Sequence, residues 1–467
     1  MIPLTPAEIA TTVGGTLHDV PEPDAPVVTG EATLDSRAVE RGGLFVALEG
    51  ERADGHDFAR TAVEAGAALV LGSRPTGVPT VVVDDVVEAL GRLTASVLAA
   101  LPDVLVLAMT GSQGKTSTKD LLAQVLAAHG PTIATRGNLN NELGVPLTAL
   151  RATPATRFLV LEMGARGVGH LAYLCSFARP RVGAVLNVGT AHLGEFGTQA
   201  DIARAKGELV ESLPPDGVAV LNADDPLVAA MASRTPAPVL RFGTGDGADL
   251  QVRDLRTDDL GRARFDLAEG EEVRSVSLRI VGEHQAANAA AAAAMARAAG
   301  LPLASVAEAL CAAGPGSPWR MQLHEVGDVV VVNDAYNANP ASMRAALHTL
   351  AGIGAARPSA RTVAVLGVMR ELGPDSEAEH ESLGEHVMAL GIDRLLVVGA
   401  EAAGITRGAL RHLEGAARTA QVGDRDEAAR WVRDNVAAHD VVLVKASRGA
   451  ALERVADALV THLEENR

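Results

Sequence analysis

The sequence has few cysteines, few aromatic residues and no excess of basic residues. Cys175 and Cys311 are its only cysteines, which excludes a disulfide framework and a cysteine-based zinc site. Aromatic side chains make up 2% of the chain, so platforms for stacking single-stranded bases are scarce. Lys and Arg number 41 against 58 Asp and Glu, a net charge of −17. Because nucleic acids and anionic membranes are bound by faces rich in Lys and Arg, we expect neither partner.

Long apolar runs and a secretion signal are also missing. No stretch reaches the roughly 18 apolar residues that identify a membrane-spanning helix. Residues 1–15 lack the basic and apolar regions of a signal peptide. With the low cysteine content, these absences predict a cytoplasmic protein without membrane insertion. The 48% of hydrophobic residues, largely Ala, Val and Leu, predicts a folded aliphatic core.

The 467 residues suffice for about three domains of roughly 150 residues each. Residues 1–97 mix short strand-like runs with Gly and Asp turns, which predicts a small α/β domain. Residues 98–313 alternate buried strands with helices, the pattern of a mostly parallel sheet. The Gly-, Pro- and Ser-rich segment 312–319 then marks a boundary. Strands and helices alternate again over residues 314–467, so we expect a three-domain α/β protein.

The strongest local motif is GSQGKT at residues 111–116, between a predicted buried strand and a predicted helix. Glycines let backbone N–H groups turn toward a phosphate, Lys115 can pair with phosphate oxygens, and the Thr116 hydroxyl can ligate Mg²⁺. The motif is not the complete P-loop pattern, because Met109 occupies the position of the first glycine. ATP or GTP is the favoured ligand, and a plain strand-to-helix turn is the alternative.

Other polar residues follow predicted strands. Glu162 ends a buried strand at the edge where ligands bind in open α/β sheets, so its carboxylate could hold Mg²⁺. His192 follows another strand and could also serve a divalent ion. Lys206 lies on a predicted amphipathic helix, and the pattern alone favours a solvated lysine. The turn 333–340 could bind ribose or a peptide, although such Asn- and Pro-rich turns are commonly only turns.

These motifs, in this order, resemble those of the Mur ligases over nearly the whole chain. The similar segments are TLDSRAVERGGLFVALEGERADGHDF (33–58), TGSQGKTSTKD (110–120), TRGNLNNELGVPLTAL (135–150), LEMGARGVGH (161–170), NVGTAHLGEFG (187–197), IARAKGELV (202–210), NDAYNANPASM (333–343), LGVMRELG (366–373) and LVKASRGAALE (443–453). The DNPR-type box of the diamino-acid-adding ligases does not occur, which favours the branch that adds a dipeptide.

The resemblance implies an ATP-dependent amide ligase that adds D-alanyl-D-alanine to UDP-MurNAc-tripeptide through an acyl phosphate. The third residue of that tripeptide is either meso-diaminopimelate or lysine. The implied domains are a UDP-substrate-binding domain at 1–97, a central P-loop ATPase domain at 98–313 and a Rossmann-like domain at 314–467. A monomer is the default expectation.

The resemblance also implies a set of site residues, each read off its matching motif. The implied catalytic residues are Lys115, Glu162, His192 and Lys206. Two Mg²⁺ ions are implied at Thr116, Glu162, His192 and Lys206, with Lys206 modified to N6-carboxylysine. The implied ATP contacts are Thr110, Gly111, Ser112, Gln113, Gly114, Lys115, Thr116, Asn288, Arg320 and Asp334. The implied substrate contacts are Ser36, Arg37, Asn138, Asn140, Asn337, Asn339, Lys445 and Arg448.

The chain departs from the family pattern at two positions. Gln285 stands where Asn usually follows the His, so we expect Asn288 rather than Gln285 to contact adenine. Trp319 stands where Gly usually precedes Arg320, and a surface arginine on a linker is the alternative for Arg320. Two other functions stay open: a related ligase acting on a different muramyl peptide or on folate and glutamate, and a nucleotide-binding module without catalysis. The implied second metal site argues against the latter, because a pure binder has no need of it.

Overall fold

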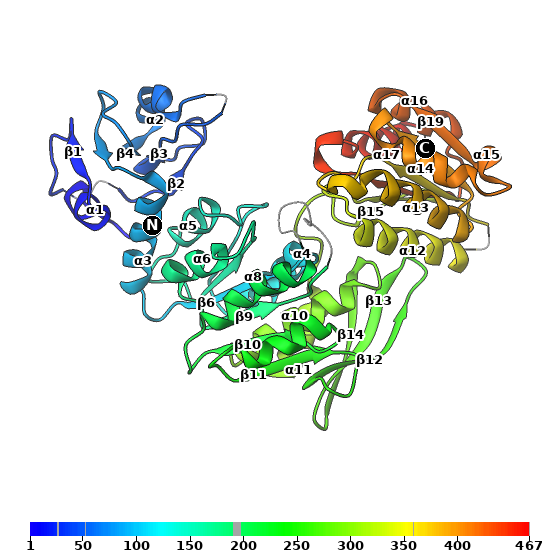
Figure 1. Ribbon diagram of the computed structural model, residues 1–467, viewed down its shortest axis with the longest axis horizontal. Coiled ribbons are helices and arrows are strands. Elements are labelled where there is room, and N and C mark those ends of the chain that lie inside the picture. The colour runs from blue at the N-terminus through cyan, green and yellow to red at the C-terminus, as the bar shows by residue number, and fades with distance from the viewer. Residues whose placement is uncertain (26–27, 52, 190–197, 358, 467) are drawn as a thin grey trace.

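The computed structural model describes residues 1–25, 28–51, 53–189, 198–357 and 359–466. They form three α/β lobes, with the first and the third standing apart on the central one (Figure 1). The predicted three-domain α/β architecture with mostly parallel sheets is confirmed. No helix in the described ranges combines the length and apolar character needed to cross a bilayer.

The N-terminal lobe contains a sheet of strand order β1-β5-β4-β3-β2, in which only β1 is antiparallel to its neighbour. Its strands are β1 (Thr16–His18), β2 (Ala32–Thr33), β3 (Gly43–Val46), β4 (Ala67–Gly72) and β5 (Thr80–Val82). Its helices are α1 (Pro6–Val13), α2 (Ala59–Ala65) and α3 (Val86–Ala99).

This lobe shares a hydrophobic core with the central lobe. Leu90 and Leu93 of α3 are fully buried in one apolar cluster with Ile9 of α1 and with Leu159 and Leu171 of the central lobe. Burial of such side chains stabilises each by roughly 1.5–3 kcal/mol relative to exposure. The first two lobes are therefore joined by packing as well as by the chain.

The central sheet has the order β14-β13-β12-β11-β10-β9-β6-β8-β7 and is parallel from β7 to β12. Its parallel strands are β6 (Leu105–Thr110), β7 (Thr132–Ala134), β8 (Phe158–Glu162), β9 (Val182–Val185), β10 (Val218–Asn222), β11 (Val239–Gly243) and β12 (Leu250–Thr257). Two antiparallel strands, β13 (Arg262–Glu269) and β14 (Glu272–Val281), extend it. This extension was not predicted from the sequence.

Helices cover the central sheet. They are α4 (Lys115–Ala127), α5 (Gly144–Ala149), α6 (His170–Ala178), α8 (Gln199–Glu211), α9 (Pro226–Ala229), α10 (Gln285–Ala298) and α11 (Leu303–Ala312). The predicted alanine-rich helix is α10, and the side chains of Ala289 to Ala294 are fully or almost fully buried in the core with those of α4 and the sheet. Small side chains there let α10 pack closely on its neighbours.

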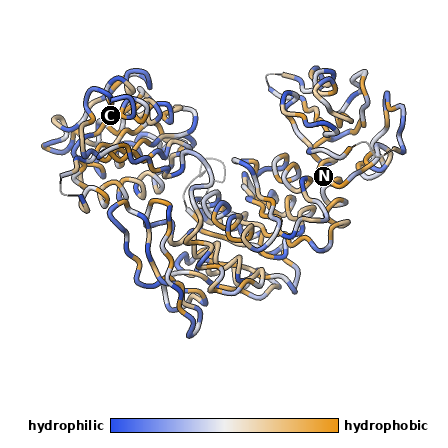
Figure 2. The backbone as a smooth tube through the Cα atoms, turned by 180° about the vertical axis from the view of Figure 1, so that it is seen from behind, coloured by the Kyte–Doolittle hydropathy of each residue, from blue (hydrophilic) through white to orange (hydrophobic). Residues whose placement is uncertain are grey.

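The C-terminal sheet has the order β15-β16-β20-β17-β18-β19, and only β15 is antiparallel. Its strands are β15 (Gln322–Val326), β16 (Val329–Asn333), β17 (Thr362–Leu366), β18 (Arg394–Val398), β19 (Thr419–Val422) and β20 (Val441–Lys445). Its helices are α12 (Pro340–Ala356), α13 (Ser376–Ala389), α14 (Ala403–Leu410), α15 (Gly415–Arg418), α16 (Arg425–Asn435) and α17 (Glu453–Glu465). In Figure 2 hydrophobic residues gather in the interior of this lobe, as they do in the other two.

The turn between β12 and β13 supports the C-terminal lobe. Leu260 of this turn is buried with residues of α12, and Gly261 beside it has φ +71°. A Cβ added at Gly261 would lie 3.0 Å from Ile353 Cγ1 and 3.2 Å from Thr349 Cγ2, both on α12. The turn therefore touches the third lobe so closely that only glycine fits.

Gly261→Ala should destabilise the protein by more than backbone strain alone, which is of order 1–3 kcal/mol for a left-handed residue. The matched control is Gly270→Ala in the β13–β14 turn, which has φ +59° but open space at the Cβ position. Urea unfolding would compare the two variants. Equal losses in the free energy of unfolding would contradict the close contact with α12.

Candidate active site

The glycine-rich loop connects β6 to the N-terminus of α4. Gly114 caps α4 in the left-handed conformation, with φ +76°. A Cβ there would lie 2.3 Å from Asn288 Oδ1, so the position requires glycine both for its backbone and for space. The N-terminus of α4 directs unpaired N–H groups and positive potential into the loop, the arrangement that suits a phosphate.

Asn187, just after β9, fixes the conformation of this loop. Its Oδ1 accepts from Gln113 N at 2.9 Å, its Nδ2 donates to Gln113 O at 3.1 Å, and its backbone O accepts from Ser112 N at 3.1 Å. This role of Asn187 was not predicted from the sequence. It could have been suspected because Asn187 follows a predicted buried strand and so lies at the same edge of the sheet as the loop.

Lys115, Thr116 and Glu162 form a polar corner beside the loop. Glu162 is only 2% exposed, and its two oxygens accept from Thr116 Oγ1 at 2.9 Å and from Asn140 Nδ2 at 2.8 Å. Lys115 Nζ donates to Gly111 O at 2.7 Å. Loss of hydration lowers the pKa of Lys115, an effect that nearby Glu162 opposes and nearby Arg320 reinforces. The predicted Lys115, Thr116, Asn140 and Glu162 thus lie together.

Lys206 of α8 is buried, with 5% of its surface exposed, and is not the solvated lysine that the helical pattern favoured. Burial, and then the like charge of Lys115, hold the pKa of Lys206 well below its usual value. Among the described residues no hydrogen bond or ion pair compensates its ammonium. An isolated buried cation is costly, so this position favours an uncharged or modified amine. His192, the other predicted ligand here, lies outside the described residues.

The oxygens of Thr116 and Glu162 are the ligand type that Mg²⁺ prefers, so this corner fits a magnesium ion. No group of three His, Cys, Asp or Glu residues suited to a metal occurs within the described ranges. A metal here would therefore depend on the hydroxyl, on one carboxylate and on oxygens from a bound nucleotide.

The start of α10 adds amide groups next to the loop. Asn288 Nδ2 donates to Gln285 Oε1 at 2.8 Å, and Asn288 Oδ1 accepts from Thr118 Oγ1 at 3.4 Å. Gln285 is 3% exposed. Gln285 therefore orients the amide of Asn288, the residue predicted for adenine. The hydroxyl of Thr110, at the end of β6, is buried without a hydrogen-bond partner in the described part of the chain.

The linker brings Arg320 toward the loop. Its guanidinium lies 4.0 Å from the centre of the Tyr336 ring, and its buried Nε has no partner among the described residues. Upstream, Gly314 is held by α4: its O accepts from Gln124 Nε2 and its N donates to Gln124 Oε1, both at 3.0 Å. The Arg320 side chain is partly buried, and so is not fully solvated on the linker.

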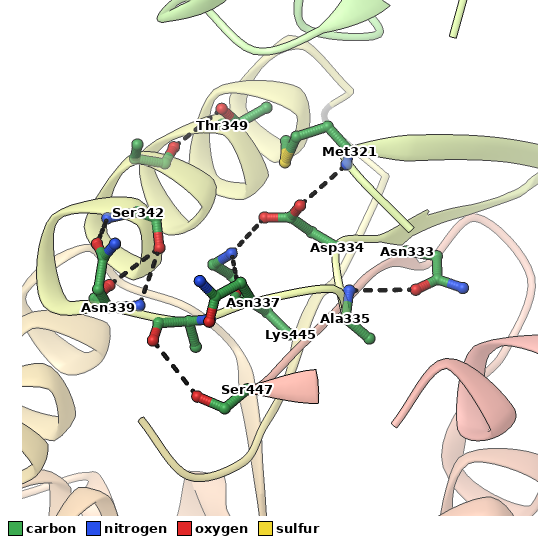
Figure 3. Close-up of polar contacts among 12 residues, drawn as sticks. Met321, Asn333, Asp334, Ala335, Asn337, Asn339, Ser342, Thr349, Lys445 and Ser447 are labelled. Carbon is green, nitrogen blue, oxygen red and sulfur yellow. Dashed lines mark hydrogen bonds and ion pairs between the residues drawn. The ribbon is translucent and has the colours of Figure 1, made fainter. Parts of the chain in front are cut away.

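In the C-terminal lobe, Asp334 and Lys445 form a buried ion pair (Figure 3). Lys445 Nζ donates to Asp334 Oδ2 at 2.6 Å and to Asn337 O at 2.8 Å, and Lys445 is 2% exposed. Met321 N donates to the other oxygen of Asp334 at 3.0 Å, which ties the end of the linker to this lobe. Asn339 caps α12 through a reciprocal pair of hydrogen bonds with Ser342.

A cavity of about 250 Å³ opens beside this ion pair, at the carboxyl ends of β16, β17 and β20. The predicted residues Asn337, Asn339 and Arg448 line it. Arg370 and Ser447 also line it and were not predicted as site residues, although both lie in segments that resemble the family. Arg370 N donates to Ser447 Oγ at 3.0 Å. A cavity with two guanidinium groups suits a small ligand that carries a carboxylate.

A larger cavity, of about 430 Å³, lies between the central lobe and α12. Its lining includes Phe242 and Ala290 and excludes every residue of the glycine-rich loop. None of the predicted site residues is among those that line this larger cavity.

Of the remaining predicted residues, Ser36 and Arg37 lie in the N-terminal lobe, and Asn138 lies between β7 and α5 of the central lobe. Arg37 makes two 2.9 Å contacts with Asp35, and its hydrogen bonds lower the pKa of Asp35 to about 2. Ser36 is buried and Asn138 is exposed. Among the described residues, the side chains of Ser36, Arg37 and Asn138 form no hydrogen bond or ion pair with the loop.

Asn187→Ala should weaken nucleotide binding by roughly tenfold, because two hydrogen bonds that fix the loop are lost. Titration calorimetry with ATP would measure this change. Asn222→Ala is the matched control: Asn222 also ends a strand of this sheet, but its Nδ2 donates to Leu186 O and not to the loop. An equal loss of affinity in both variants would count against the role of Asn187.

Comparisons with known proteins bear on this geometry. Sequence profiles match at residues 31–100 (Mur ligase family, catalytic domain), 109–296 (Mur ligase middle domain) and 319–448 (Mur ligase, glutamate ligase domain). The chain is 47% identical to the UDP-N-acetylmuramoyl-tripeptide–D-alanyl-D-alanine ligase of Mycobacterium tuberculosis, over 98% of both chains.

Solved structures agree with the sequence matches. A crystal structure of MurF from Acinetobacter baumannii superposes with a TM-score of 0.86 at 32% identity, covering 98% of this chain and 99% of that one. MurF ligase from Thermotoga maritima in complex with ADP gives 0.82 at 31% identity, covering 95% and 100%. The glycine-rich loop, the buried Glu162 and these full-length similarities lead to one conclusion: the chain belongs to the Mur ligase family.

Proposed function

We propose that the chain is an ATP-dependent ligase that joins D-alanyl-D-alanine to UDP-MurNAc-tripeptide in peptidoglycan precursor synthesis. The products are UDP-MurNAc-pentapeptide, ADP and phosphate. The observation that carries the proposal is the full-length similarity to ligases of that name, combined with a loop built for nucleotide phosphates. We further propose a monomer acting in the cytoplasm, where ATP and UDP-linked precursors are available.

The chemistry requires activation, because a carboxylate is a poor electrophile. The terminal carboxylate oxygen of the tripeptide attacks the γ-phosphorus of ATP, the bond to ADP breaks, and an acyl phosphate forms. The amine of D-alanyl-D-alanine then attacks the acyl carbon and loses a proton, and the tetrahedral intermediate expels phosphate to leave the amide. The protein contributes position and charge neutralisation.

Lys115 and Arg320 are the cations that we assign to the phosphates. Burial and, to a smaller extent, the like charge of Arg320 lower the pKa of Lys115, so the two cations lie close enough to act on one ligand. Polyphosphate between them would replace mutual repulsion by two attractions. The buried Arg320 Nε without a partner in the described ranges supports this assignment. We assign Asn288 to adenine and Asp334 to ribose.

Thr116 and Glu162 would hold one magnesium ion, and His192 with modified Lys206 a second. Bound magnesium would neutralise charge that develops on the phosphoryl oxygens. The burial of Lys206 supports its modification, because a lowered pKa leaves more of the amine neutral. The neutral nitrogen can add to CO₂, forming an N–C bond and releasing a proton. The carbamate so formed is an anion beside Lys115.

The cavity beside Asp334 and Lys445 is our proposed site for D-alanyl-D-alanine. Arg370 and Arg448 supply donors for its carboxylate, and Asn337 and Asn339 supply amide groups. Ser36, Arg37, Asn138 and Asn140 are assigned to the UDP-linked substrate. Because an acyl phosphate hydrolyses in water, we propose that the C-terminal lobe swings onto the central one when ATP and substrate bind.

The reaction can be tested by product mass and phosphate release with Mg-ATP, UDP-MurNAc-tripeptide and D-alanyl-D-alanine, omitting each in turn. Pentapeptide should form only in the complete mixture. Lys115→Ala should abolish turnover while circular dichroism stays unchanged. If ATP is consumed only when another acceptor replaces D-alanyl-D-alanine, the ligase chemistry stands and the proposed substrate is refuted. If ATP is not consumed at all, the alternative of a nucleotide-binding module without catalysis is favoured.

Lys206→Ala should lower kcat by roughly 100-fold or more, because the anion that would hold a metal is lost. Added formate or acetate should restore part of the activity by supplying a carboxylate in the vacated space. Lys206→Arg is the matched control, since its guanidinium fills the space and cannot form the carbamate. Absence of rescue in Lys206→Ala would argue against the carbamate.

A further inference from the structure

Trp319 occupies a conformation that tryptophan rarely adopts. Its φ is +57°, in the left-handed region that favours glycine. Its backbone is held there at both ends: Trp319 N donates to Gln322 Oε1 at 3.1 Å, and Trp319 O accepts from Tyr336 N at 3.2 Å. The turn therefore fixes the direction in which the indole ring leaves the chain.

The ring does not contribute to the core. Trp319 belongs to none of the apolar clusters formed by the described residues, whereas Trp431, the other tryptophan of the chain, packs on the cluster beneath α16 and α17. Instead, the guanidinium of Arg448 lies over the Trp319 ring, 4.2 Å from its centre. A cation over an indole face is the strongest form of this contact.

Arg448 is also held from a second direction. Its NH1 donates to Glu453 Oε1 at 2.7 Å, at the start of α17. A face contact with the ring and an edge contact with the carboxylate together fix a planar guanidinium in orientation. Arg448 is exposed and lines the 250 Å³ cavity with Arg370 and Asn337, so N–H groups not used by Glu453 remain for a ligand.

We propose that Trp319 is a positioning residue that holds Arg448 for the carboxylate of the incoming dipeptide. The inference rests on the proposed function, because it takes the cavity at Arg448 as the dipeptide site. Without the indole face, the half-exposed Arg448 side chain would keep its ion pair with Glu453 but would be free to sample other rotamers. Ordering it again on binding would then weaken the affinity for the dipeptide.

The test compares Trp319→Gly, Trp319→Phe, Arg448→Ala and the double variant Trp319→Gly/Arg448→Ala. Trp319→Gly should raise KM for D-alanyl-D-alanine roughly five- to tenfold, with KM for ATP and for UDP-MurNAc-tripeptide unchanged. Its Tm should be equal to or above that of the wild type, because glycine accepts a positive φ without strain. Trp319→Phe keeps a ring face and should restore most of the affinity.

In the Arg448→Ala background, Trp319→Gly should cause no further rise in KM, since the two residues act through one contact. A rise that persists there, a rise in all three KM values, or a fall in Tm would assign Trp319 a merely structural role. An active wild type with an unchanged KM in Trp319→Gly would overturn this inference alone. A wild type that forms no pentapeptide would overturn the proposed function as well.

Discussion

The parallel pairing of β6 with β8 and β9 is the constraint on which the candidate site depends. The register sets Met109 opposite Glu162 and Thr110 opposite Val185, so three strands end at one edge. There the loop that follows β6 meets the carboxylate of β8 and the amide that follows β9. A slip of one residue in β8 would turn Glu162 to the opposite face of the sheet. Apart from Thr110 and Glu162 at their ends, these strands are apolar and buried on both faces, which holds the register.

The sequence predicted those parts of the fold that depend on local pattern. Apolar runs predicted the parallel strands, and GSQGKT (111–116) predicted the loop together with its lysine and hydroxyl. What it did not predict depends on pairing between distant segments. The strands β13 and β14 are an exception: their buried apolar residues, such as Ala263, Phe265 and Val276, alternate with more exposed polar ones, a pattern typical of antiparallel strands that went unrecognised. Lys206 is buried because other segments of the chain pack against α8. The spacing of apolar residues along the helix does not show which segments those are.

The roles of single polar side chains were the hardest to predict. Asn187 acts on the loop only because β9 lies beside β6, and Asn288 reaches Thr118 only because α10 packs on α4. Lys445 was predicted to contact substrate, and the structure gives it a buried partner, Asp334, 111 residues away in sequence. Contacts over such separations are set by topology, which a residue pattern does not encode.

The linker that attaches the C-terminal lobe affects how fast the two halves of the candidate site can come together. The linker is held at Gly314 by Gln124, and Trp319 is already part of the C-terminal lobe, so only residues 315–318 lie between two fixed points. A chain of that length reaches at most roughly 17 Å. Such a short tether keeps the two halves of the site at a high effective concentration toward one another. Pro315 and Pro318 fix the backbone φ angle at two of these four positions, which reduces the number of conformations of the linker. The C-terminal lobe can therefore take up fewer orientations relative to the central one before the site is assembled.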